Sequence, residues 1–117
     1  IDFAEATTGK CNCTFCWKRR AWSVKVKPDA FRELTGEGAL RRYPDHPHVA
    51  GGGFCTTCGV APYLKMAATD WNDGPEISVN VACLDDLDPA ELIAARVQYY
   101  DGRADNWWNP PAETRHL

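Results

Sequence analysis

Five of the six cysteines in this 117-residue chain lie in two short clusters, and these clusters carry the clearest chemistry in the sequence. The first cluster is Cys11, Cys13 and Cys16, and the second is the CxxC pair Cys55 and Cys58. Thiolates at such spacings are ligands of tetrahedral zinc, which binds sulfur at about 2.3 Å. The sequence therefore predicts one or two zinc ions. The triplet supplies three ligands and leaves a fourth position open, as catalytic zinc sites do.

Three other uses of these cysteines remain open. Disulfides would suit a secreted protein, but Cys11 and Cys13 are too close to bond to each other comfortably, and the first residues have neither the basic region nor the apolar run of a signal peptide. A redox role for Cys55 and Cys58 lacks the βαβ pattern of such motifs. Four of the clustered cysteines could also close around a single zinc, leaving no open position. We expect reduced thiols in a cytoplasmic protein.

The composition argues against nucleic acid and membrane partners. The formal net charge is −3, whereas binding to phosphates needs a basic surface. Hydrophobic residues make up 44% of the chain, and no segment approaches the roughly 18 apolar residues that a membrane span requires. We expect a single domain over residues 1–117. One basic run, Lys18, Arg19 and Arg20, directly follows the triplet and predicts either a binding site for a small anionic ligand or a solvated turn.

The hydrophobic pattern predicts short strands and single helical turns. Strands are predicted at residues 21–26, 39–43, 61–66, 76–84 and 96–100. The run 76–84 alternates most cleanly and is expected to be central. Helical turns are predicted over 27–34, opened by Pro28, and after Asp88, which precedes a proline. The pattern favours a mainly β fold of several small antiparallel sheets around the metal sites.

The remaining reactive and aromatic residues each have a structural interpretation. Cys83 lies in an apolar run and is expected to be a small buried hydrophobe. His46 and His48 lie between prolines in a polar loop, where solvation is favoured over a role as fourth metal ligand. Trp17 and Trp107-Trp108 could line a ligand pocket, but core packing is the favoured interpretation.

The order of these motifs resembles the glutathione-dependent formaldehyde-activating enzyme (GFA) family, which includes the centromere protein V domain. The resemblance is carried by the Cys-x-Cys-x-x-Cys triplet with basic residues after it, a Val-rich strand, a Pro-Asp-x-Phe turn, a Phe-Cys-x-x-Cys-Gly knuckle and the run Val79-Asn80-Val81-Ala82-Cys83-Leu84-Asp85. It covers nearly the whole chain. The resemblance implies an Mss4-like fold of small antiparallel sheets with two zinc sites.

In that family pattern, the triplet holds the zinc associated with activity, which here assigns Cys11, Cys13 and Cys16 as metal ligands and catalytic residues. Cys55 and Cys58 correspond to half of a structural zinc site, whose other half is a Cys-x-Cys pair on an N-terminal strand. Only ten residues precede Cys11, and they contain no such pair. Either this strand was removed or left out of the sequence, or the protein has lost the second zinc. We expect truncation, because two orphan thiolates and a lost edge strand would leave metal binding and sheet pairing incomplete.

The resemblance also implies an activity, the reversible joining of a thiol such as glutathione to formaldehyde or a related electrophile. This is carbon–sulfur lyase chemistry, and a thiolate is the nucleophilic form of the thiol. Lys18, Arg19 and Arg20 are candidates for binding a carboxylate of the thiol, because guanidinium groups suit that geometry. The alternative is a non-catalytic, zinc-stabilised binding module with the same fold.

Overall fold

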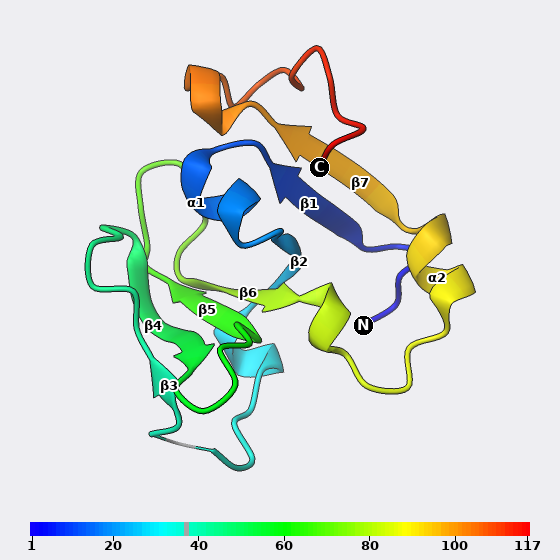
Figure 1. Cartoon of the computed structure of the whole chain (residues 1–117). Helices are drawn as coiled ribbons and strands as arrows, with labels where there is room; N and C mark the ends of the chain where they lie inside the picture. Colours follow the sequence, from blue (N-terminus) through cyan, green and yellow to red (C-terminus); the bar gives the residue numbers. More distant parts are fainter. Residues whose placement is uncertain (37) are drawn as a thin grey trace. The chain divides into compact units, whose positions relative to one another are not determined.

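The computed structural model describes every residue except Glu37 and is mainly β (Figure 1). Its strands are β1 (Thr7–Cys11), β2 (Trp22–Val26), β3 (Leu40–Arg41), β4 (Val49–Cys55), β5 (Tyr63–Met66), β6 (Glu76–Asn80) and β7 (Arg96–Tyr100). Its α-helices are α1 (Thr14–Lys18) and α2 (Pro89–Ala94). Short 3₁₀ turns occupy Pro28–Ala30, Val81–Cys83 and Gly102–Ala104. The mainly β prediction is confirmed.

The chain forms two compact units, one made of Ile1–Val24 with Leu84–Leu117 and one made of Lys25–Cys83. In the first unit β1 lies between β2 and β7. It pairs antiparallel with β2 and parallel with β7, and Figure 1 shows β1 and β7 side by side. The parallel pairing corrects the prediction of antiparallel sheets for this part of the chain. Parallel pairing is possible here because the two strands are joined through most of the sequence rather than by a hairpin.

The core of the first unit contains a buried threonine whose hydroxyl both donates and accepts a hydrogen bond. Thr8 Oγ1 donates to the carbonyl oxygen of Arg96 at 2.9 Å and accepts from Trp22 Nε1 at 2.8 Å. Phe3, Val24 and Ala95 complete the buried set of this unit, with the side chain of Asn12. These bonds connect β1 to both of its neighbours and so fix the strand that ends at Cys11.

The second unit is an antiparallel sheet in the order β3, β4, β5 and β6. Val49, Leu64, Ile77 and Val81 are its buried side chains. Strand β4 has three consecutive glycines and an irregular register between Val49 and Gly51. A Cβ on Gly53, where φ is +130°, would lie 1.9 Å from the carbonyl oxygen of Arg41. This strand therefore requires a residue without a side chain where it approaches β3.

Several predicted elements are confirmed, and others are shorter than predicted. Strands over 21–26 and 96–100 are present, and Asp88 caps α2 by accepting from the N–H of Ala90 at 2.9 Å. The predicted strand 39–43 is reduced to β3, 61–66 begins only at Tyr63, and the turn over 27–34 is limited to Pro28–Ala30.

The prediction of a strand over 76–84 is wrong beyond Asn80. There, Asn80 Oδ1 accepts from the N–H of Ala82 at 3.1 Å and the chain turns into a 3₁₀ helix. Asparagine side chains compete in this way for backbone groups that a sheet would otherwise pair. Among the described residues, no helix is long and apolar enough to cross a membrane.

The close approach at Gly53 yields a stability prediction. Gly53→Ala should lower the free energy of unfolding by more than about 3 kcal/mol, because the added Cβ must displace backbone atoms of β3. Gly36→Ala is the matched control, since Gly36 also has positive φ (+81°) but no atom within 4 Å of a Cβ, and should cost only about 1 kcal/mol. Urea unfolding of both variants measures the difference, and equal losses would contradict the steric explanation.

Candidate metal centre

The structure brings the three cysteines of the triplet together at the end of β1. Cys11 is the last residue of β1, Cys13 is the N-cap of α1, and Cys16 lies within α1. Their sulfur atoms all lie within 4.8 Å of one another, and all three residues are half-buried. Among the described residues, this is where three or more potential metal ligands converge. The grouping of these three residues agrees with the predicted first cluster.

The turn between β1 and α1 is held by hydrogen bonds to sulfur. The N–H of Cys13 donates to Cys11 Sγ, and the N–H of Cys16 donates to Cys13 Sγ, each at 3.4 Å. A cysteine at the N-cap takes the role usually filled by an oxygen side chain, accepting from an otherwise unpaired helix N–H. The spacing of the motif thus sets the first turn of α1 and points the sulfurs toward one another.

Electrostatics within the triplet favour one thiolate and oppose a second. A hydrogen bond from the Cys16 thiol is the largest influence lowering the pKa of Cys11 to about 6; burial opposes it, and N–H donors on Cys13 and Gly102 add to the lowering. The same hydrogen bond with Cys11, together with burial and the nearby sulfur charges, raises the pKa of Cys16. Ionisation of Cys16 next to the other two sulfurs is therefore opposed unless a positive charge lies nearby.

A metal ion fits this donor set. Three convergent sulfurs are suited to a soft or borderline-soft divalent metal, and the observed separations are compatible with tetrahedral bonds of about 2.3 Å. A bound cation would also remove the electrostatic obstacle to ionising Cys16. The geometry is therefore compatible with a metal ion.

One wall of the triplet is formed by the turn after β7, which sequence reasoning did not identify. A Cβ on Gly102 would lie 2.7 Å from Cys11 Sγ, 3.0 Å from the Cβ of Cys13 and 2.7 Å from the Trp107 ring. The main chain at Gly102 therefore lies directly against Cys11 Sγ and the Cβ of Cys13. The only sequence signal was the Asp101-Gly102 pair, which indicates a turn but not its neighbour.

The buried side chain of Asn12 attaches this turn to the triplet. Its Nδ2 donates to Asp101 Oδ1 at 2.6 Å, and its Oδ1 accepts from the N–H of Arg103 at 2.9 Å. The N–H of Asn12 also donates to the carbonyl oxygen of Tyr100 at 3.2 Å. Both polar ends of the buried amide are thus paired. Sequence reasoning gave Asn12 no role.

The predicted basic run lies at the end of α1 and beyond it. Lys18 is exposed, and the Arg19 guanidinium lies 4.6 Å from the centre of the Phe15 ring. Arg20 Nη1 donates to the carbonyl oxygen of His116 at 2.8 Å. Their predicted role in binding a ligand stays a prediction.

Cys55, which is half-buried, and Cys58, which is exposed, form a knuckle at the end of β4. The N–H of Thr57 donates to Cys55 Sγ at 3.4 Å, and the N–H of Gly59 donates to the carbonyl oxygen of Cys55 at 2.8 Å. Backbone donors, Cys58 first and then Thr57, lower the pKa of the Cys55 thiol. Gly59 has φ +78°, as such a knuckle favours. The assignment of this pair to a structural zinc stays a prediction.

The other residues considered from sequence have different surroundings. His46 and His48 stack edge to face with ring centres 5.9 Å apart, and His48 also meets Trp71 at 4.9 Å. Neither histidine belongs to the converging ligand group found in the described part of the chain. Cys83 ends a 3₁₀ turn and is half-buried rather than fully buried.

The prediction that the tryptophans pack in the core is wrong for Trp107 and Trp108. Trp107 is 47% exposed and Trp108 is 85% exposed, because the segment that carries them leaves the sheet after β7. Trp17 is half-buried beside the triplet, with the His116 ring edge-on at 5.5 Å. Trp107 borders Gly102, so one exposed tryptophan lies next to the metal centre.

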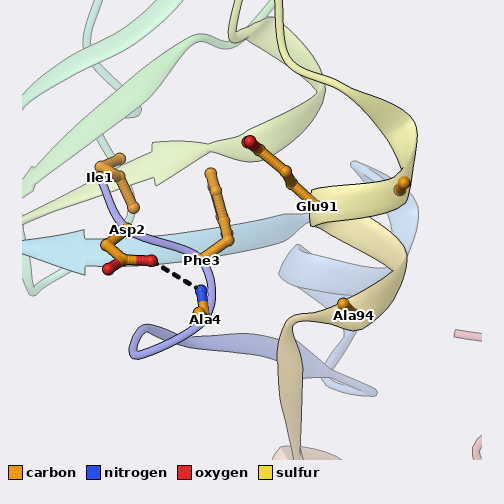
Figure 2. A pocket seen from close by; sticks show the side chains of 7 residues that line it. Ile1, Asp2, Phe3, Ala4, Glu91 and Ala94 are labelled. Atoms are coloured by element: carbon orange, nitrogen blue, oxygen red, sulfur yellow. Dashed lines mark hydrogen bonds between the residues drawn. The ribbon is translucent and has the colours of Figure 1, made fainter.

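A separate pocket of about 610 Å³ lies between the first residues of the chain and α2 (Figure 2). Its lining is mostly apolar, and Asp2 in it accepts from the N–H of Ala4 at 3.0 Å. It contains none of the residues predicted to act as ligands or to bind substrate. We assign it no part in the chemistry.

The comparisons with known proteins give a structural neighbour but no function. No protein-family model matches the chain, and no curated protein matches it. Among solved structures, it is similar to a Rhodobacter sphaeroides protein determined as a structural genomics target. The two share 27% identity over 84% of each chain, with a TM-score of 0.60.

Loss of one triplet ligand should weaken metal binding selectively. Cys13→Ser should lower Co²⁺ affinity by more than about a hundredfold, since losing even an outer-shell partner costs about 10- to 100-fold. Sulfur-to-cobalt absorption in a competition titration measures this. The matched control is Cys58→Ser, which should leave the absorption of the triplet unchanged. Equal weakening in both variants would contradict the assignment of the site.

Gly102 offers a second test that leaves all three ligands in place. Gly102→Ala should lower Co²⁺ affinity by roughly tenfold or more, because the new Cβ would displace Cys11 Sγ. Gly59→Ala adds the same atom where nothing lies within 4 Å and should leave the affinity unchanged. Unaltered affinity in Gly102→Ala would show that the turn does not constrain the sulfurs.

Proposed function

We propose that the protein is a zinc-dependent enzyme of the glutathione-dependent formaldehyde-activating type, with an Mss4-like fold. The observation that supports this most directly is the convergence of Cys11, Cys13 and Cys16 within 4.8 Å at one end of β1. Three sulfur ligands are one fewer than a closed structural zinc site needs. The proposed reaction is the formation and cleavage of a carbon–sulfur bond between a thiol, such as glutathione, and an aldehyde.

The triplet would hold the zinc, and the surrounding backbone would stabilise the ligands. When bound, the ion supplies a position at which a thiol is held as its nucleophilic thiolate. The N–H groups of Cys13 and Gly102 stabilise negative charge on Cys11. The half-buried position of the sulfurs restricts water on one side, and the absence of a side chain at Gly102 lets its main chain lie against Cys11.

The proposed reaction needs no oxidant or reductant. The sulfur electron pair forms a bond to the carbonyl carbon, the carbon–oxygen π pair moves to oxygen, and the thiol proton ends on that oxygen. The reverse process releases thiol and aldehyde. Lys18, Arg19 and Arg20 stay candidates for a carboxylate on the thiol, and Cys55 and Cys58 for a structural zinc.

The activity can be tested directly by exchange NMR. Zinc-loaded protein should raise the exchange rate between ¹³C-formaldehyde and its glutathione adduct above that of the uncatalysed mixture. Cys13→Ser should return the rate to the uncatalysed value, since one of three ligands is lost. If the wild-type protein leaves the exchange rate unchanged while still binding zinc, the enzyme proposal fails and a zinc-stabilised binding module is the better interpretation.

A further inference from the structure

Arg103 presents a cation beside the triplet, on the turn that follows β7. Its guanidinium carbon lies 5.1 Å from the centre of the Trp17 ring, and the residue is exposed. Trp17 directly follows the ligand Cys16, and Arg103 directly follows Gly102, which touches Cys11. Trp17 is therefore next in sequence to a candidate metal ligand, and Arg103 is next in sequence to the glycine that contacts another.

The position of Arg103 is fixed by its backbone and by its ring contact. Its N–H donates to Oδ1 of the buried Asn12, the residue between two of the ligands. Stacking over an indole ring orients the plane of a guanidinium and still leaves its N–H edge available for a planar anion. An arginine held at both ends in this way loses less conformational freedom on binding a ligand than a free surface arginine.

The nearby acidic groups have other hydrogen-bond partners. Asp101 accepts from Asn12 Nδ2, and Asp105 accepts from Trp107 Nε1 at 2.7 Å. None of the ion pairs found among the described residues includes Arg103. By contrast, Arg20 donates to the carbonyl oxygen of His116, and Arg115 is paired with Glu113. Arg103 thus carries a charge that enters none of these ion pairs, and it directly follows the glycine whose main chain lies against Cys11.

We propose that Arg103 binds a carboxylate on the substrate thiol, so that the site selects small mercapto acids over neutral thiols. This inference rests on the proposed function, because it takes a thiol to be bound at the triplet. It assigns the anion-binding role to a residue 83 positions beyond Arg20 in the chain, outside the basic run that the sequence suggested. Bidentate pairing of guanidinium with carboxylate is the geometry it uses.

Thiol binding to the cobalt-loaded protein tests this inference without measuring activity. The probes are 3-mercaptopropionate and 2-mercaptoethanol, which have the same carbon spacing from sulfur to the carboxylate or hydroxyl. Each is titrated while sulfur-to-cobalt absorption is followed in the wild type, Arg103→Met and Arg115→Met. The ratio of the two affinities is compared between proteins, so that differences in thiol acidity cancel. Arg115→Met is the matched control because it removes the same charge from an exposed arginine of the same unit.

The preference for 3-mercaptopropionate should fall about fivefold in Arg103→Met, the size expected when one exposed ion pair is lost. Binding of 2-mercaptoethanol should be unchanged, and Arg115→Met should keep the wild-type ratio. An unchanged ratio in Arg103→Met, or an equal fall in Arg115→Met, would overturn the role of Arg103 while leaving thiol binding intact. If neither thiol binds the wild-type protein, the proposed function fails and this inference fails with it.

Discussion

The candidate site depends on one buried amide, the side chain of Asn12. It lies between two ligands and bonds to both sides of the turn that follows β7, bridging residues about ninety positions apart in sequence. A buried amide that lost a partner would leave a polar group unpaired, at a cost of about 1–3 kcal/mol. The register of β1 with β7, which pairs Cys11 with Tyr100, makes this bridge possible because it ends both strands at the same level.

The same bridge explains how residues from the turn after β7 come to surround the triplet. Holding the turn against β1 places the N–H of Gly102 against Cys11, and it carries Arg103 and Trp107 into the neighbourhood of the sulfurs. Each feature is useful to a reaction at sulfur: a donor for negative charge, a cation and an apolar surface. None of them comes from the segment that contains the cysteines.

The difference between local spacing and contacts with distant segments accounts for what the sequence could predict. Ligand spacing is a local property, so the triplet was recognisable, as was α2 through Asp88 and the proline after it. The parallel pairing of β1 with β7 joins distant segments and has no local signature. Strand β4 was missed because three glycines weaken strand propensity, and the need for them arises only from close contacts with β3 and β5. Asn12, Gly102 and Arg103 acquire their roles through these non-local contacts.

The two cysteine clusters differ in what holds their shape. In the knuckle, the backbone N–H of Thr57 donates to Cys55 Sγ, and Cys58 is exposed to solvent. The triplet instead points three half-buried sulfurs at one another, and the pKa of Cys16 is raised because its neighbours oppose its ionisation. Charge interactions strengthen as water is excluded, so a cation among the half-buried sulfurs of the triplet would interact with them more strongly than a cation beside the exposed Cys58. The first cluster is therefore the one whose folded geometry itself favours a metal.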